Sequence, residues 1–204
     1  MSLPLLWNYD EIHTHSPVKN STLLVMLYEP PPNDPLINRA VAWLDGPFSH
    51  VEVAFTDGMA SSIYAGEKVF MHERRFANPN YTAVAVQVTQ KQEADARQFC
   101  IDSAHQAVDF DGLGMYISPL PHICKRIVSM FTRRKKMSTF CSKHVVDVFQ
   151  HIGMDGFMEI DSSSTTPSMV HRILQQYCTQ VMATTAYKRG LLVTNGVIPV
   201  FKMQ

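Results

Sequence analysis

Cys141 has the sequence setting of a reactive thiol. The stretch STFCSKHVVDVFQHIG carries apolar residues at three- and four-residue steps and ends at Gly153, which predicts a helix with Cys141 in its first turn. The unpaired N–H groups and partial positive charge of a helix start lower the pKa of a thiol there. The backbone N–H groups of Cys141 and Ser142 are also suited to bind an oxyanion. Cys141 is therefore a candidate nucleophile.

His50 is the candidate base for this nucleophile. It lies near the start of the stretch FSHVEVAF, in which Val51, Val53 and Phe55 line one face of a predicted buried strand. His50 and Glu52 then share the other face, because positions two apart in a strand point the same way. A carboxylate beside an imidazole fixes its tautomer and stabilises its cation. Glu52 is thus either a third catalytic residue or a residue that holds the strand in place.

The surrounding sequence predicts the elements that position these residues. Thr89 and Gln92 form the capping box that starts a helix. Leu36, Ala40, Val41 and Leu44 lie at helical spacing and a glycine follows them, which predicts a helix that leads into the His50 strand. The mixed order of strands and helices predicts a single α+β domain over residues 1–204. Strands are expected at 22–28, 48–55, 59–72 and 81–89, helices at 36–46, 90–108, 138–153 and 168–177, and a terminal hairpin within 188–204.

The composition is that of a protein with a hydrophobic core. Of the 204 residues, 46% are hydrophobic and 18% are charged, and the 18 basic residues balance the 18 acidic ones. A balanced charge gives no general attraction to nucleic acid, so no specific nucleic acid binding is expected. No signal peptide or stretch of ~20 apolar residues is recognisable. The four cysteines lack the spacing of a disulfide scaffold, which favours reduced thiols in a cytoplasmic protein.

Two further clusters of residues allow a binding role. The segment 125–137 is the one concentrated basic feature, and it either contacts an anionic surface or is a solvated loop. Its cations are Lys125, Arg126, Arg133, Arg134, Lys135 and Lys136. The pairs His122 with Cys124 and Cys141 with His144 offer four zinc ligands, but their spacing is unlike that of common zinc knuckles. We therefore expect neither a metal nor another cofactor.

The order of the motifs in this chain resembles that of a known hydrolase family. FSHVEVAFTDG, DFDGLGMY, TFCSKHVVDVFQHIG and TTPSMVHRIL, within residues 20–175, are similar to the circularly permuted NlpC/P60 group of papain-like thiol hydrolases. In that group the His strand precedes the Cys helix, as in its viral and phage members. The resemblance implies Cys141 as nucleophile and His50 as base, on an antiparallel sheet or half-barrel packed against the Cys helix.

The third catalytic residue of the family is less well matched. It usually lies on the strand after the His, where this sequence offers Ser62; Glu52 and His72 are the other candidates. The resemblance implies hydrolysis of a peptide, isopeptide or ester bond, in host cytoplasm or a virion if the protein is viral. Two alternatives stay open. One is a lipid acyltransferase or phospholipase of the lecithin:retinol acyltransferase type, although the Asn-Cys-Glu-His signature is absent, and the other is a non-enzymatic viral or virion binding module.

Overall fold

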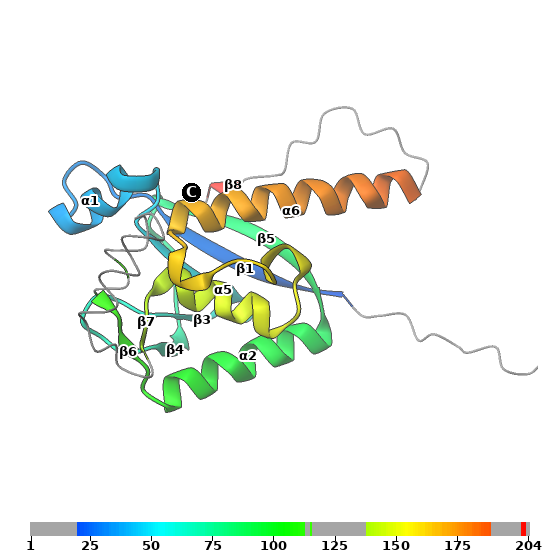
Figure 1. Ribbon diagram of the computed structural model, residues 1–204, viewed down its shortest axis with the longest axis horizontal. Coiled ribbons are helices and arrows are strands. Elements are labelled where there is room, and N and C mark those ends of the chain that lie inside the picture. The colour runs from blue at the N-terminus through cyan, green and yellow to red at the C-terminus, as the bar shows by residue number, and fades with distance from the viewer. Residues whose placement is uncertain (1–19, 113–114, 116–137, 189–200, 203–204) are drawn as a thin grey trace, which may run out of the picture.

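A computed structural model describes residues 20–112, 115, 138–188 and 201–202 of the chain (Figure 1). An antiparallel sheet runs in the order β4-β3-β2-β1-β5-β8, and β6 and β7 form a separate parallel pair. The strands are β1 (Asn20–Tyr28), β2 (His50–Phe55), β3 (Met59–Ser62), β4 (Phe70–Glu73), β5 (Tyr81–Thr89), β6 (Asp109–Phe110), β7 (Ser138–Thr139) and β8 (Phe201–Lys202). The helices are α1 (Leu36–Asp45), α2 (Gln90–His105), α5 (Cys141–His151) and α6 (Pro167–Lys188), with 3-10 turns η1 (Asp155–Phe157) and η2 (Ser162–Ser164). The predicted α+β class is confirmed.

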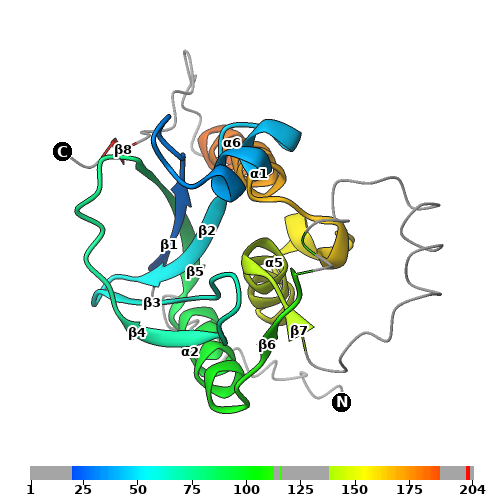
Figure 2. The same ribbon diagram turned by 90° about the vertical axis from the view of Figure 1, so that its left-hand side faces the viewer.

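The two faces of the sheet have different surroundings. Val51, Val53 and Phe55 of β2 point into the main core, together with apolar residues of β1, β5, α2, α5 and α6. The opposite face carries a smaller cluster that includes Met26, Ala54 and Tyr81. Figure 2 shows the strands curving around this second face, with α2 and α5 on the first. Glu52 points to the second face, since it alternates with Val51 and Val53 along β2.

Helix α5 packs directly on β2 and so brings the Cys end of the helix to the His end of the strand. Its Val145, Val146, Val148 and Phe149 have no exposed surface. Burying each such side chain stabilises the fold by roughly 1.5–3 kcal/mol. The helix ends at His151, and Gly153 just beyond it, with a φ of 68°, fits the predicted glycine stop.

Several local predictions agree with the structure. The Thr89 capping box is present: the Thr89 hydroxyl accepts from the Gln92 backbone N–H, and the Gln92 side chain accepts from the Thr89 N–H. The stretch after Gly58 forms two strands, β3 and β4. The helix predicted from residue 138 begins later, at Cys141. Ser138 and Thr139 instead form β7, which pairs with β6.

Other predictions need correction. The predicted helix α1 is present, and its Leu36 side chain is 78% exposed, because α1 meets the rest of the molecule mainly through α6. The last helix was expected to end near Tyr177, whereas α6 continues to Lys188. The terminal hairpin lies largely outside the described residues, and its Phe201 and Lys202 pair with β5. The basic segment 125–137 also lies outside them. Among the described helices, none has both the length and the apolar character needed to cross a bilayer.

A glycine fixes how the chain enters β2. Gly46 follows α1 with a φ of 137°, and a Cβ there would lie 2.8 Å from the Ser168 Oγ of α6. That same Oγ accepts a hydrogen bond from the Phe48 N–H at 3.2 Å. The turn therefore holds α1, α6 and the residues just before His50 together.

We expect Gly46→Ala to lower the free energy of unfolding by about 1–3 kcal/mol, because the backbone is strained and Ser168 must move. Thermal melting measures this loss. Gly66→Ala is the matched control, since Gly66 also has a positive φ, 82°, but no atom within 4 Å of an added Cβ. Equal losses in the two variants would contradict the proposed contact with Ser168.

Candidate active site

Strand β2 places His50 and Glu52 side by side, as their spacing predicts. The His50 Nε2 lies 3.5 Å from the Glu52 Oε1. His50 is opposite Tyr28 of β1, and Tyr28 is opposite Tyr81 of β5. The three aromatic side chains therefore form one row across the sheet at the end nearest α5.

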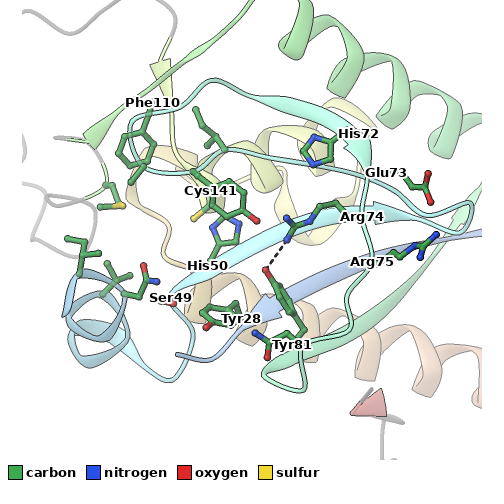
Figure 3. A pocket seen from close by; sticks show the side chains of 18 residues that line it. Tyr28, Ser49, His50, His72, Glu73, Arg74, Arg75, Tyr81, Phe110 and Cys141 are labelled. Carbon is green, nitrogen blue, oxygen red and sulfur yellow. Dashed lines mark hydrogen bonds between the residues drawn. The ribbon is translucent and has the colours of Figure 1, made fainter. Parts of the chain in front are cut away.

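Cys141 is the first residue of α5 and faces His50. The residue before it, Phe140, has extended backbone angles (φ −138°, ψ 167°), so the helix starts abruptly at the cysteine. Figure 3 shows the Cys141 sulfur beside the His50 ring. The Ser142 hydroxyl points elsewhere, because it donates to the Thr165 carbonyl at 2.7 Å. The thiol thus has the unpaired N–H groups of a helix start on one side and an imidazole on the other.

His50 and Cys141 share a pocket of about 620 Å³. Its wall comes from α1, β2, the segment between β3 and β4, and the segment between β4 and β5 (Figure 3). The lining is mixed in character: Ile37, Val41, Ile63, Phe110 and Met115 are apolar, and Asn38, Tyr64, His72, Arg74 and Asn78 are polar. A substrate carbonyl in this pocket would have access to both Cys141 and His50.

Glu52 is fully buried beneath the pocket and is held by several donors. Its Oε1 accepts hydrogen bonds from the Arg74 Nη2 at 2.9 Å, the Tyr81 hydroxyl at 3.0 Å and the Tyr64 hydroxyl at 3.1 Å. Its Oε2 has no hydrogen-bond partner among the described residues. The Tyr64 ring also stacks on His50, with ring centroids 4.7 Å apart. One carboxylate oxygen therefore links four side chains from four parts of the sheet.

The pKa values of the pair favour the charged forms. Burial alone lowers the pKa of His50, but the interactions with Cys141 and then Glu52 outweigh it and raise this pKa to about 9. Burial alone raises the pKa of Glu52, but His50, Arg74 and Tyr81 outweigh it and hold this pKa below its ordinary value. Near neutral pH, an imidazolium and a carboxylate therefore lie side by side.

The two tyrosines act as neutral donors. Burial, and then the charge of Glu52, raise the pKa of Tyr64 to about 12. The same two causes raise the pKa of Tyr81 further. Both phenols keep their protons at neutral pH and so keep donating to the carboxylate.

The other candidates for the third residue lie in different surroundings. The Ser62 hydroxyl is buried and donates to the Val51 carbonyl at 2.8 Å. His72 lines the pocket and its ring lies 4.4 Å from that of Phe70. Of the three candidates, Glu52 is the one with an ion-pair contact to the His50 ring.

His144 is a buried residue of α5. It is buried against the sheet, and its Nε2 lies 2.9 Å from the Ser61 Oγ of β3. Burial is the largest cause that lowers the pKa of His144 to about 4, so its ring is neutral. Its proposed zinc partners His122 and Cys124 lie outside the described residues. Within the part of the chain that the structure describes, no three His, Cys, Asp or Glu side chains are arranged to hold a metal ion.

The sequence reasoning missed Arg74, Tyr64 and Tyr81. Each is far from Glu52 along the chain, and the order of strands in the sheet brings them together. One signal was available for Tyr81, which begins a predicted strand, while His50 lies near the start of another. Arg74 follows a strand in a polar segment, where an arginine is ordinarily exposed to solvent.

Glu52→Gln is expected to lower the pKa of His50 by at least about one unit, because a neutral amide stabilises an imidazolium less than a carboxylate does. NMR titration of the His50 ring, assigned with a His50→Gln variant, measures the change. Glu73→Gln is the control, since Glu73 is an exposed carboxylate of β4 that lines the same pocket. A His50 pKa that is the same in wild type and Glu52→Gln would contradict the assigned contact.

Comparisons of the chain with family models, with curated proteins and with solved structures found no match. The candidate active site is therefore defined by the residues and geometry described above. Its centre is the contact of one imidazole with a thiol on one side and a buried carboxylate on the other.

Proposed function

We propose that the protein is a cysteine hydrolase that cleaves an amide or ester bond through Cys141, His50 and Glu52. The observation that carries the proposal is the position of His50, which interacts with both the Cys141 thiol and the Glu52 carboxylate in one pocket. A thiol, a base and a group that orients the base are the parts that thiol hydrolysis requires. The resemblance to permuted NlpC/P60 proteins supports the same roles.

The first half of the proposed reaction forms an acyl-enzyme. In the resting pair His50 already holds the proton of Cys141 as an imidazolium, and the Cys141 thiolate attacks the substrate carbonyl carbon. The carbonyl electron pair moves to oxygen, and this oxyanion accepts hydrogen bonds from the backbone N–H groups of Cys141 and Ser142. When the carbonyl re-forms, the bond to the amine or alcohol breaks, and His50 donates its proton to that leaving group. A thioester on Cys141 remains.

The second half releases the acid. His50 removes a proton from a water molecule as its oxygen attacks the thioester, and the thiolate leaves with the electron pair of the broken bond. Glu52 stays ionised throughout and stabilises the imidazolium of His50. Its hydrogen bonds from Arg74, Tyr64 and Tyr81 fix the position of the carboxylate, so the imidazole ring keeps one orientation.

An acyl lipid is the second candidate substrate. On α1, Ile37 and Val41 line the pocket, while Leu36 and Trp43 are 78% and 85% exposed. Exposed apolar groups next to a pocket favour a substrate with an apolar chain that is met at an interface. Turnover of phospholipid and lysophospholipid, measured beside that of peptide amides and esters, separates this candidate from peptide hydrolysis.

Labelling by an electrophile tests the nucleophile. With low concentrations of iodoacetamide at pH 7, we expect Cys141→Ala to be labelled at least about tenfold more slowly than wild type, because only a thiolate reacts quickly. Mass spectrometry of the labelled peptides identifies the modified cysteine. Cys100→Ala is the matched control, since burial raises the pKa of Cys100 to about 12 and its side chain has no exposed surface.

His50→Gln should slow the labelling of Cys141 while leaving the fold intact by thermal melting. Equal fast labelling of wild type and Cys141→Ala would rule out Cys141 as the nucleophile. That result would favour the non-enzymatic binding module, in which the cysteine and histidine have only structural roles.

A further inference from the structure

Four ionisable side chains form one connected cluster around the pocket. The Arg74 Nη2 contacts the Glu52 Oε1 at 2.9 Å, the Glu52 Oε1 lies 3.5 Å from the His50 Nε2, and His50 faces Cys141 (Figure 3). The exposed fractions of the Glu52, His50 and Arg74 side chains are 0%, 12% and 25%. Charges with so little exposure are weakly solvated, so the net charge of the cluster affects which of its groups are ionised.

That sum is zero only when Arg74 is included. In the reactive form of the site, the Cys141 thiolate and the Glu52 carboxylate are negative, and the His50 imidazolium and the Arg74 guanidinium are positive. Without Arg74, two anions would share one imidazolium and the cluster would carry a net charge of minus one. A buried cluster avoids such a charge by taking up a proton, and the thiolate is the anion whose protonation leaves the His50 and Glu52 pair intact.

The side chain of Arg74 is held in position. Its Nη2 also donates to the Tyr81 hydroxyl at 3.2 Å, and its guanidinium lies 5.3 Å from the centre of the Phe76 ring and 5.6 Å from that of Tyr64. The Arg74 backbone N–H donates to the Gly58 carbonyl at 2.9 Å, which fixes the chain after β4 to the turn between β2 and β3. The positive charge is therefore built into the fold.

We infer that Arg74 is a positioning residue whose guanidinium is the counter-charge that lets the Cys141 thiolate coexist with Glu52. Arg74 thereby sets the lowest pH at which Cys141 is reactive. The inference rests on the proposed function, because it assigns a role within the same site.

The other titratable groups near the cluster leave this charge count unchanged. Tyr64, after β3, and Tyr81, on β5, face Glu52 and are neutral donors. Further out, Tyr28 of β1, His72 and Glu73 of β4, and Arg75 line the pocket. Figure 3 shows Arg75 extending away from Cys141, and Arg75 is exposed. Arg74 is thus the arginine that contacts the buried carboxylate.

The test is the pH dependence of Cys141 alkylation by iodoacetamide between pH 5 and 9, followed on the Cys141 peptide by mass spectrometry. In Arg74→Ala, the midpoint of the rise in rate should move up by at least about one pH unit, the effect of one charge at close range. Arg74→Lys keeps the charge and should return the midpoint most of the way to the wild-type value. Arg39→Ala removes an exposed positive charge of α1 that is not part of the pocket lining and should leave the midpoint unchanged.

A double variant tests whether Arg74 acts through the charge balance. In Glu52→Gln combined with Arg74→Ala, the carboxylate and the guanidinium are both lost, so the reactive form is again neutral. Its midpoint should lie below that of Arg74→Ala alone, a coupling that independent effects would not give. If Arg74→Ala acted only by loosening the fold, the added Glu52→Gln change would not bring the midpoint below that of Arg74→Ala alone.

The outcomes separate this inference from the proposed function. If wild-type Cys141 reacts no faster than Cys100 at any pH, the proposed function fails. If Cys141 reacts quickly but Arg74→Ala has the wild-type midpoint, or the double variant shows no coupling, the role of Arg74 alone is overturned. Should thermal melting show Arg74→Ala unfolded, Arg74→Gln removes the charge with less loss of packing, and a wild-type midpoint in that variant would also overturn the role.

Discussion

The buried charge of Glu52 is the constraint on which the rest of the site depends. A carboxylate with no exposed surface costs several kcal/mol unless charged and hydrogen-bonding partners compensate for the lost water. Arg74, Tyr64, Tyr81 and His50 provide that compensation from four parts of the sheet. The strand order, the curvature of the sheet and the path of the chain after β4 are the means by which these partners reach one oxygen atom.

The candidate nucleophile, Cys141, comes from the other side of the sheet. Helix α5 is held on the face of β2 opposite Glu52 by its buried valines and Phe149, and its first residue meets the end of the strand at His50. The imidazole therefore lies where the two faces join, with the apolar core on one side and the polar cluster on the other. This position explains how one residue contacts both a helix start and a buried carboxylate.

Local patterns in the sequence predicted the local parts of this arrangement. Alternation along β2 correctly put His50 and Glu52 on one face, and the helical pattern correctly put Cys141 in a first turn. The donors to Glu52 were not predictable in this way, because their positions depend on which strands pair. The exposure of Leu36 has a related cause: a helical pattern identifies an apolar side, but whether that side is covered depends on distant elements.

The neutral His144 and the charged His50 give the fold opposite responses to pH. The pKa of His144 is about 4 in the folded chain and 6.5 ordinarily, so unfolding becomes more favourable as the pH falls from 6.5 towards 4. The pKa of His50 is raised to about 9 by Cys141 and then Glu52, so the folded chain keeps this proton at a pH where an unfolded histidine has lost it. One imidazole therefore limits the fold in acid, while the other stays charged only as long as the fold keeps Cys141 and Glu52 beside it.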